Sequence, residues 1–440
     1  MPFTLADIGV VMLTSGFLLA VLVQLTRLTL FKKRAESLTY WCTMTPILLG
    51  LVGVLIVITG LILDGPTVHY IGNWFGNEFY QYHLSITADW LAVTYACLTL
   101  LLLGLVAVFS RSYLHKDNGF HRFYFLLTLF GAGLLTASFA GTLELLIVGW
   151  ELVGISSVLL ISFFTYRPEP PKSALYTFII YRCCDIGLIA AAFLVHLLGQ
   201  HADFHHLNHT AWFGVNVSDM VLWIGGFLLL AAAGKAALFP FSSWLPRAME
   251  GPTPSSAIFY GALSVHLGPL LLLRCADVFA ASLWLQGALV VVGGLTALFG
   301  RLVARVQNDI KSRLAYASVI QLGVIVVEIG LGFYNLALFH VFTHAILRTL
   351  QILRAPSLLQ EYQHLSQMIG HSYAATRSFD ERVSLWQCIV YRFSLERALL
   401  DTFWRDHVLG SLGIMINRID QLDQSIARLL TGEPVKGRKK

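Results

Sequence analysis

The sequence predicts an all-α polytopic membrane protein of about eleven transmembrane helices, followed by an amphipathic helical tail. Hydrophobic residues make up 56% of the 440 positions and charged residues only 12%, whereas soluble domains carry about 25% charged residues. Apolar stretches of roughly 20 residues, long enough to cross a bilayer, recur along the chain. Basic residues gather in alternate connections between these stretches, which is typical of polytopic membrane proteins.

The apolar stretches define the helices in order. The first, LADIGVVMLTSGFLLAVLV, has no basic segment before it, which predicts a retained first helix and not a cleaved signal peptide. At about 20 residues per crossing, we expect eleven spans over residues 6–28, 41–63, 89–110, 123–142, 144–165, 174–199, 218–240, 256–277, 281–303, 314–332 and 335–354.

The charged connections predict the orientation of the chain. Connections 64–88 and 200–217 contain no lysine or arginine. Basic residues instead follow the odd-numbered spans: Arg27, Lys32, Lys33, Arg34, Arg111, Lys116, Arg122, Arg167, Lys172, Arg247, Arg301, Arg305, Lys311 and Arg313. Because basic connections stay in the cytoplasm, we expect the N-terminus outside and residues 355–440 in the cytoplasm. Basic residues confined to short connections and to the C-terminus give no sign of nucleic-acid binding, despite a net charge of +5.

Two connections and the cysteines carry signals of their own. Residues 64–88 have alternating aromatic residues and an Asn/Gly-rich turn region, which predicts an external β-hairpin. The stretch HADFHHLNHT holds four irregularly spaced histidines, and we expect no metal there. The six cysteines form no CxxC motif, so neither a disulfide framework nor a zinc site is expected. We expect no metal or cofactor bound by this chain.

The two predicted domains are a transmembrane bundle over residues 1–356 and a cytoplasmic tail over residues 357–440. The tail repeats apolar positions at helical spacing with charges between them, which favours an amphipathic helix that docks on a partner. A helix lying on lipid is the alternative, and a twelfth span near 383–400 is another. The expected apolar contacts are Phe393, Leu395, Leu399, Phe403, Trp404 and Leu409.

The main clue to function is Lys235, which ends an otherwise uncharged run from Val221. A charge at membrane depth costs roughly 3 kcal/mol or more, so such residues usually face a bundle interior or a water-filled path. Four prolines and two glycines between residues 234 and 254 exclude one continuous helix, and broken helices lie at ion sites in transporters. The alternative is a helix end from which Lys235 snorkels to the cytoplasmic surface.

Further ionisable residues interrupt apolar segments. On the eleventh span, His340, His344 and Arg348 share one helix face, and histidine is suited to proton relay. A row of buried acids, bases and histidines is what a proton path needs, although a hydrogen-bonded core histidine is the alternative reading. The other members are Glu144, Glu151, Arg182, Asp185 and His266.

The acidic members leave two interpretations open. An unpaired carboxylate at the depth of Glu151 would be protonated, whereas near Lys235 it could stay ionised and a moving proton could switch the pair. The alternative is a fixed structural ion pair. Arg182 and Asp185, spaced i, i+3 on the sixth span, present the same choice. Glu144, close to a helix start, is expected at the membrane interface.

Four stretches resemble the proton-conducting antiporter-like subunits, which include the largest such membrane subunit of respiratory complex I and the Mrp-type antiporters. They are GWELVGISSVLLISFF, GKAALFPFSSWLPRAMEGPTPSSA, VQNDIKSRLAYASVIQLG and FHVFTHAILRTLQIL. The resemblance extends over roughly residues 80–355. It implies a fold with two inverted five-helix repeats, each containing a broken helix.

The resemblance also implies roles for individual residues. Glu151 and Lys235 correspond to the key glutamate–lysine pair of the family. Other family polar positions are Asp185, Lys311, His340 and His344. Tyr260 stands where the family usually has a histidine, with His266 further along. Arg348 occupies a usual lysine position, and arginine holds its proton more firmly. We therefore expect the distal half of the usual path to be altered, without the further spans of a complex I subunit.

The segment THAILRTLQILRAPSLLQEYQHL and the tail ERALLDTFWRDHVLGSLGIMINRIDQLDQSIARLL most resemble the shorter DabB-type membrane subunit of the bacterial DAB inorganic-carbon accumulation complexes. The resemblance implies a protein of the bacterial inner membrane that pairs with a large cytoplasmic zinc-binding subunit related to β-carbonic anhydrases. Proton flow would energise the hydration of CO2 to bicarbonate in that partner, where the zinc is expected.

We therefore expect a transport subunit without catalysis of its own, which conducts protons across the lipid bilayer to drive inorganic-carbon uptake. A subunit of complex I or of an Mrp-type cation/proton antiporter is the alternative, and a non-conducting structural anchor is a third hypothesis. The residues expected along the proton path are Glu151, Lys235, Asp185, Arg182, Lys311, His340, His344, Arg348 and His266.

Overall fold

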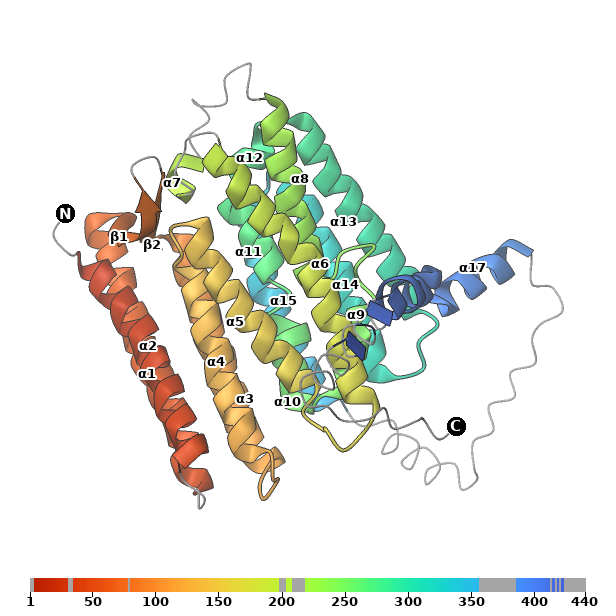
Figure 1. Ribbon diagram of the computed structural model, residues 1–440, viewed down its shortest axis with the longest axis horizontal. Coiled ribbons are helices and arrows are strands. Elements are labelled where there is room, and N and C mark those ends of the chain that lie inside the picture. The colour runs from red at the N-terminus through yellow and green to blue at the C-terminus, as the bar shows by residue number, and fades with distance from the viewer. Residues whose placement is uncertain are drawn as a thin grey trace. The chain divides into compact units, whose positions relative to one another are not determined.

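The computed structural model describes residues 4–30, 35–77, 80–197, 203–207, 218–355 and 385–411, with isolated positions up to residue 422. Within these residues, nine continuous helices are long and apolar enough to cross a membrane, which confirms the predicted all-α polytopic class (Figure 1). They are α1 (Leu5–Leu30), α2 (Glu36–Asp64), α3 (Trp90–Tyr113), α4 (Phe120–Ser138), α5 (Leu143–Ile161), α6 (Glu169–Leu197), α13 (Leu283–Ala304), α14 (Ile310–Gly330) and α15 (Tyr334–Arg354).

The seventh and eighth expected spans are interrupted. α8 (Ser218–Lys235) stops at Lys235 and not at residue 240 as the sequence suggested, because Ala237 takes a positive φ of 52° and Pro240 follows. The indole Nε1 of Trp244 donates to the carbonyl oxygen of Gly234 at 2.9 Å. This bond satisfies one of the carbonyls that a helix end leaves without an intrahelical partner.

Short helical pieces replace the rest of the two interrupted spans. They are α9 (Trp244–Arg247), η2 (Ala248–Glu250), α10 (Thr253–Ser256), the π-helical η3 (Ala257–Ala262), α11 (Leu267–Arg274) and α12 (Ala276–Ala280). Non-helical backbone at membrane depth is tolerated where protein surrounds it. The buried side chains of Leu238 and Trp244 meet that condition.

Glycines allow close approach of the helices that carry the ionisable residues. A Cβ added to Gly149 of α5 would lie 2.5 Å from the nitrogen of Ala137 in α4, and one on Gly187 of α6 would lie 2.4 Å from the carbonyl oxygen of Phe227 in α8. Small residues at helix crossings are a usual packing device in membranes. These contacts fix the relative positions of α4, α5, α6 and α8.

The β-hairpin predicted for residues 64–88 is present. β1 (Thr67–Asn77) pairs antiparallel with β2 (Tyr80–Ala88). The hairpin contacts the connection between α4 and α5 through Thr87 N to Phe139 O and Gly141 N to Ser85 O, each 2.9 Å. The short helix α7 (Phe204–Leu207) contacts the same connection, since Phe204 N donates to Gly141 O at 2.9 Å. These elements therefore cover one end of the bundle.

One arginine lies at the end of the bundle where the sequence predicted no basic residues. Arg274, at the end of α11, is buried at the end of the bundle that carries the hairpin. Its guanidinium forms an ion pair with Asp89 and donates from Nη2 to Ser138 O at 2.8 Å. Asp89 also caps α3 by accepting from Ala92 N at 2.8 Å. Arg274 is thus a structural bridge between helix ends.

Residues 382–440 form a second compact unit. Its described part contains α17 (Leu385–Leu395), η4 (Arg397–Leu399), α18 (Leu400–Phe403) and η5 (Trp404–Leu409). Residues 397–399 all have positive φ, so the expected amphipathic helix is interrupted there. α17 has 11 residues, too few to cross a hydrocarbon core of about 30 Å.

Most of the apolar contacts expected in the tail are exposed: Phe393, Leu395, Leu399 and Phe403. Trp404 is only 8% exposed, in contrast to these four side chains. The side chain of Leu409 and the segment 356–384 lie outside the described residues.

Candidate functional site

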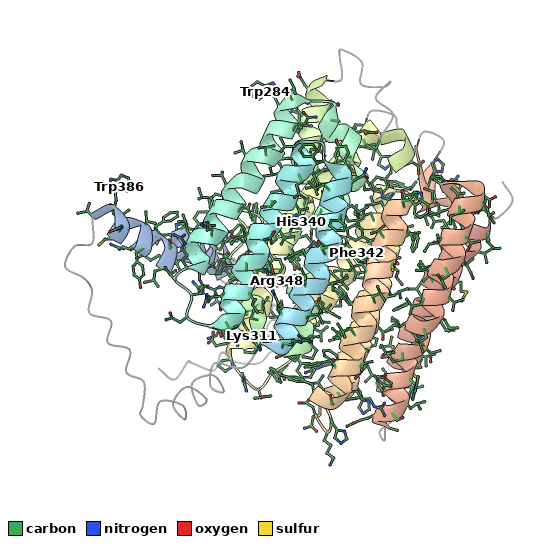
Figure 2. The ribbon with its side chains drawn as sticks, turned by 180° about the vertical axis from the view of Figure 1, so that it is seen from behind. Trp284, Lys311, His340, Phe342, Arg348 and Trp386 are labelled. Carbon is green, nitrogen blue, oxygen red and sulfur yellow. The ribbon has the colours of Figure 1, made fainter. Side chains whose placement is uncertain are left out.

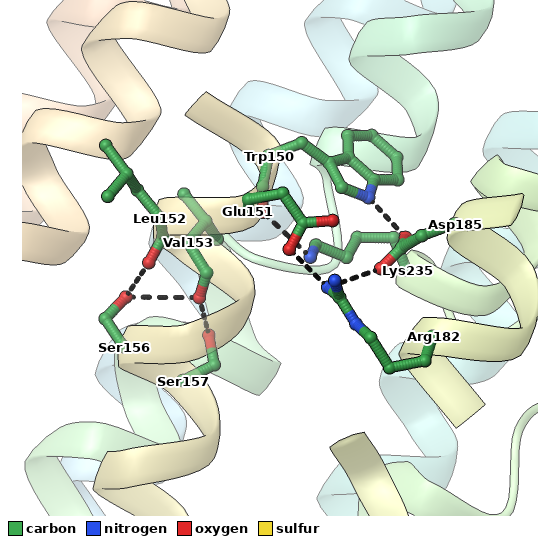
Figure 3. A network of polar contacts seen from close by, with 9 residues as sticks. All are labelled: Trp150, Glu151, Leu152, Val153, Ser156, Ser157, Arg182, Asp185 and Lys235. Atoms are coloured by element: carbon green, nitrogen blue, oxygen red, sulfur yellow. Dashed lines mark hydrogen bonds and ion pairs between the residues drawn. The ribbon is translucent and has the colours of Figure 1, made fainter. Parts of the chain in front are cut away.

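Four ionisable side chains from three helices meet in the interior of the bundle (Figure 3). α5 supplies Glu151, α6 supplies Arg182 and Asp185, and α8 ends at Lys235. Arg182 and Asp185 share a face of α6 because they are three residues apart. Two carboxylates and two cations together carry no net formal charge, which lowers the cost of placing charges at this depth.

Arg182 links the two carboxylates. Its Nη2 lies 2.5 Å from Oε2 of Glu151 and 2.8 Å from Oδ2 of Asp185. A guanidinium presents several donors in a rigid fork, so it can contact two carboxylates at once. Glu151 is therefore in direct contact with Arg182, while the pairing of Glu151 with Lys235 that the resemblance implies stays a prediction.

Trp150 provides a second hydrogen-bond donor to the carboxylate of Asp185. The indole Nε1 donates to Oδ1 of Asp185 at 2.6 Å, while Arg182 occupies the other carboxylate oxygen. Asp185 is only 4% exposed, so these two donors replace the hydration that its charged form would need. Sequence reasoning missed Trp150, although a buried indole usually finds an acceptor for its N–H.

Lys235 lies deepest of the four, at 1% exposure. Its Nζ donates to the carbonyl oxygen of Trp150 at 3.1 Å and lies 5.0 Å and 4.3 Å from the ring centroids of Trp150 and Tyr181. Within the described part of the chain it has no ion pair within 4.0 Å. A Cβ on Gly154 would come within 3.0 Å of Nζ, so this glycine leaves space for the ammonium group.

A second polar cluster contains the three predicted histidines. His266, which precedes α11, and His344 of α15 are joined by a 3.0 Å contact between Nε2 and Nδ1. The ring centroids of His344 and His340 lie 6.4 Å apart. His340 contacts Glu328 at 3.0 Å through Nδ1 and Gln321 at 2.9 Å through Nε2. Glu328 and Gln321 of α14 were not predicted, although both are polar residues within an expected span.

Arg348 and Lys311 lie on the same side of the molecule as this cluster. Figure 2 places Lys311, Arg348 and His340 at successive levels along the bundle. Arg348 is mostly buried and donates from Nη1 to Gln351 Oε1 at 2.9 Å. Lys311 donates to Thr253 Oγ1 at 3.0 Å. The side chain of Tyr260 lies outside the described residues.

Two buried nitrogens of the second cluster have no hydrogen-bond partner among the described residues. They are Nε2 of His344 and Nε of Arg348. Buried polar atoms are nearly always satisfied by protein or ordered water. The two clusters are also close neighbours, since a Cβ on Gly268 of α11 would lie 2.7 Å from the Cβ of Ala236, the residue after Lys235. The arrangement can hold and exchange protons through lysine and histidine nitrogens.

The sequence also made predictions about Glu144, about the histidines near residue 205 and about the cysteines. Oε1 of Glu144 lies 2.5 Å from Nε2 of His196, and both side chains are largely buried. Glu144 lies in the first turn of α5, so its expected place at the membrane interface stays a prediction. Among the described residues no group of three or more His, Cys, Asp or Glu could hold a metal ion. The side chains of the loop histidines His201, His205, His206 and His209 lie outside the described residues. The six cysteines are free thiols.

Solved structures with a similar fold are respiratory and antiporter complexes. A chain of the Mrp complex from Dietzia sp. DQ12-45-1b superimposes with a TM-score of 0.67 and 25% identity, covering 86% of this chain and 39% of that one. A chain of the membrane-bound sulfane sulfur reductase, an archaeal respiratory membrane complex, gives a TM-score of 0.65 at 18% identity, covering 88% of this chain and 77% of that one. The second similarity concerns the fold alone.

Curated relatives are similar over about 70% of this chain. NADH-ubiquinone oxidoreductase chain 5 of Dictyostelium discoideum is 34% identical in an alignment of 328 positions, which covers 70% of this chain and 48% of the relative. The chloroplastic NAD(P)H-quinone oxidoreductase subunit 5 of Zea mays is 31% identical in an alignment of 315 positions, which covers 70% of this chain and 42% of the relative. The match thus spans about half the length of these relatives.

Two family matches cover most of the bundle. Residues 74–124 match the N-terminal part of NADH-ubiquinone oxidoreductase (complex I) chain 5. Residues 140–385, more than half of the chain, match the transmembrane family of NADH:quinone oxidoreductases and Mrp antiporters. Both polar clusters lie within this second match. The chain therefore belongs to the NADH:quinone oxidoreductase/Mrp antiporter family of membrane subunits.

Proposed function

We propose that this chain is a membrane subunit that conducts protons through the two buried polar clusters. The observation that carries the proposal is Lys235, a nearly inaccessible ammonium group at the end of a broken helix, next to three other ionisable side chains. Intramembrane ionisable residues mark ion and proton pathways by default. The family match supports the same role.

Within the first cluster, Lys235 is the cation that can release a proton. The guanidinium of Arg182 stays protonated in proteins, whereas a buried lysine can exchange its proton. Lys235 contacts a carbonyl oxygen and two aromatic rings, so its deprotonation strands no directly bonded carboxylate. The cluster would then carry one net negative charge, which attracts the next proton.

The second cluster would receive the proton. The contact between Ala236 and Gly268 brings the end of α8 against α11, and His266 immediately precedes α11. His266, His344 and His340 are then arranged in sequence from ring to ring. A neutral imidazole has one donor and one acceptor nitrogen, so such a row can pass a proton along. Water is needed where the rings are not in direct contact.

For the whole assembly, we propose that proton flow energises inorganic-carbon uptake through a large cytoplasmic zinc-binding subunit related to carbonic anhydrases. This finer proposal rests on the resemblance of the tail to DabB-type subunits. The exposed Phe393, Leu399 and Phe403 support it as contacts for a partner. The protein would lie in the bacterial inner membrane with its N-terminus outside and its tail in the cytoplasm.

The names of the relatives and solved structures favour the alternative, a proton-pumping subunit of a complex I-like or Mrp-type assembly. Purification of the native complex separates the two. Zinc recovered with a large soluble partner supports the carbon-uptake proposal, whereas quinone- and NADH-linked partners or Mrp subunits support the alternative.

Replacing Lys235 by methionine should abolish proton-coupled activity of the native complex, measured as proton flux in vesicles. Lys235→Arg should also lower the flux at least about tenfold, because a guanidinium does not release its proton at neutral pH. Lys172→Met is the matched control, since Lys172 is exposed and paired with Glu169. Flux is normalised to the amount of folded complex. Normal flux with Lys235→Met would leave only the structural-anchor hypothesis.

Arg182→Met should destabilise the protein more than Lys235→Met does. Removal of Arg182 leaves two carboxylates without their shared donor. We expect this to lower the free energy of unfolding by about 3 kcal/mol. This is the lower end of the range for buried pairs, because Arg182 is partly exposed. Lys235 has no directly bonded carboxylate, so its loss should cost less. Thermal unfolding midpoints of the detergent-purified variants measure the order. A larger shift for Lys235→Met would contradict this division of roles.

Deleting residues 357–440 should leave the bundle inserted but release the cytoplasmic partner, together with its zinc, during purification. The reason is that the exposed apolar side chains of the tail would be lost. Deletion of residues 423–440 alone is the control, because it removes the basic C-terminus and keeps those side chains. A partner that stays bound after the larger deletion rules out docking through the tail.

A further inference from the structure

A pocket of about 490 Å³ opens between α13 and α14 at the end of the bundle where Lys311 lies (Figure 2). Three exposed arginines line it: Arg301 in α13, Arg305 at the C-cap of α13, and Arg313 in α14. Ile310 and Leu314 contribute apolar walls. The pocket therefore combines a strongly positive rim with an apolar interior.

The three arginines differ from other arginines at this end of the bundle in the contacts that the described residues make with them. None of their guanidinium groups forms a hydrogen bond or an ion pair within the described part of the chain. Other arginines at this end do have one: Arg122 donates to Phe163 O at 2.5 Å, and Arg111 lies 4.7 Å from the centroid of the Tyr40 ring. Three unpaired positive charges around one pocket repel each other, and a bound anion would remove that repulsion.

The adjacent face of α13 indicates where this anion comes from. Val291, Leu295 and Leu298 are 58%, 46% and 56% exposed and form one stripe along the helix, since they are spaced by three or four residues. The stripe continues to Arg305, seven residues after Leu298. An apolar, lipid-facing stripe that ends in unpaired arginines matches an acyl chain that ends in a phosphate headgroup.

We propose that this pocket binds an anionic phospholipid, with its headgroup phosphate held by Arg301, Arg305 and Arg313 and its acyl chains along the exposed stripe of α13. Guanidinium groups bind phosphate oxygens through paired N–H donors. Basic pockets between transmembrane helices on the cytoplasmic side are a recognised form of lipid site. The predicted orientation places this end of the bundle in the cytoplasmic leaflet.

The test is lipid competition on the full chain in detergent. Phosphatidylglycerol and phosphatidylcholine with identical acyl chains are added in equal amounts, and the bound lipids are counted by native mass spectrometry. The unchanged protein should retain phosphatidylglycerol selectively. The triple variant Arg301→Gln, Arg305→Gln, Arg313→Gln should lose that selectivity about tenfold or more, because each arginine that contacts the headgroup phosphate contributes roughly fivefold, whereas a basic residue away from the pocket makes no such contact.

The matched control is Lys116→Gln, Arg167→Gln, Lys172→Gln, which removes the same charge from exposed positions at the same end. It should change the selectivity less than about twofold, well below the fivefold expected for a single arginine of the pocket. If the triple variant does not fold, the single variants Arg305→Gln and Arg313→Gln should each show a loss of a few-fold.

Three outcomes would overturn the proposal. The first is equal loss in the control variant, which would mean an unspecific effect of surface charge. The second is displacement of the lipid by glycerol 3-phosphate at equal concentration, which would mean a site for soluble phosphates. The third is that the full chain binds no lipid selectively. This result would also be seen if an acidic protein segment already occupied the pocket.

Discussion

The guanidinium of Arg182 contacts the carboxylates of Glu151 and Asp185 at 2.5 and 2.8 Å inside an apolar bundle, and the arrangement around it follows from that bridge. The negative charges of the buried Asp185 and the half-buried Glu151 would otherwise have to be neutralised by protonation or by other donors. Because Arg182 already holds both carboxylates, Lys235 is left to contact a carbonyl oxygen and two aromatic faces. In the proposed path, the mobile proton and the fixed charge thus belong to different residues.

The break in the chain after Lys235 serves the same arrangement. A continuous helix would carry its backbone past this level, whereas α8 ends at Lys235 and Trp244 returns to satisfy the carbonyl of Gly234. Gly149 and Gly187 bring the neighbouring helices within backbone contact of α4 and α8. Close packing leaves little freedom for the side chains between them. The positions of the charges are therefore set by the backbone.

The sequence alone predicted the class, the hairpin and the interruption near residues 234–254, because hydropathy, turn residues and prolines act locally. It did not predict which charges pair. Arg182 and Asp185 could be placed on one face by their spacing, but the contact of Arg182 with Glu151 depends on how α5 and α6 are rotated. Both helices are apolar nearly all round, so periodicity gives no facing direction. Glu328, the partner of His340, was missed because it lies near the end of an expected span.

In the proposed path, the surroundings of the histidine row favour His340 as the position of a bound proton. Arg348 lies one helical turn from His344 and stays protonated, so it raises the cost of a second positive charge there. At the other side, the carboxylate of Glu328 lies 3.0 Å from His340 and stabilises a positive charge on that ring. A proton that enters between His266 and His344 is therefore drawn toward His340. That residue lies nearer the start of α15, and thus nearer the end of the bundle predicted to face outside.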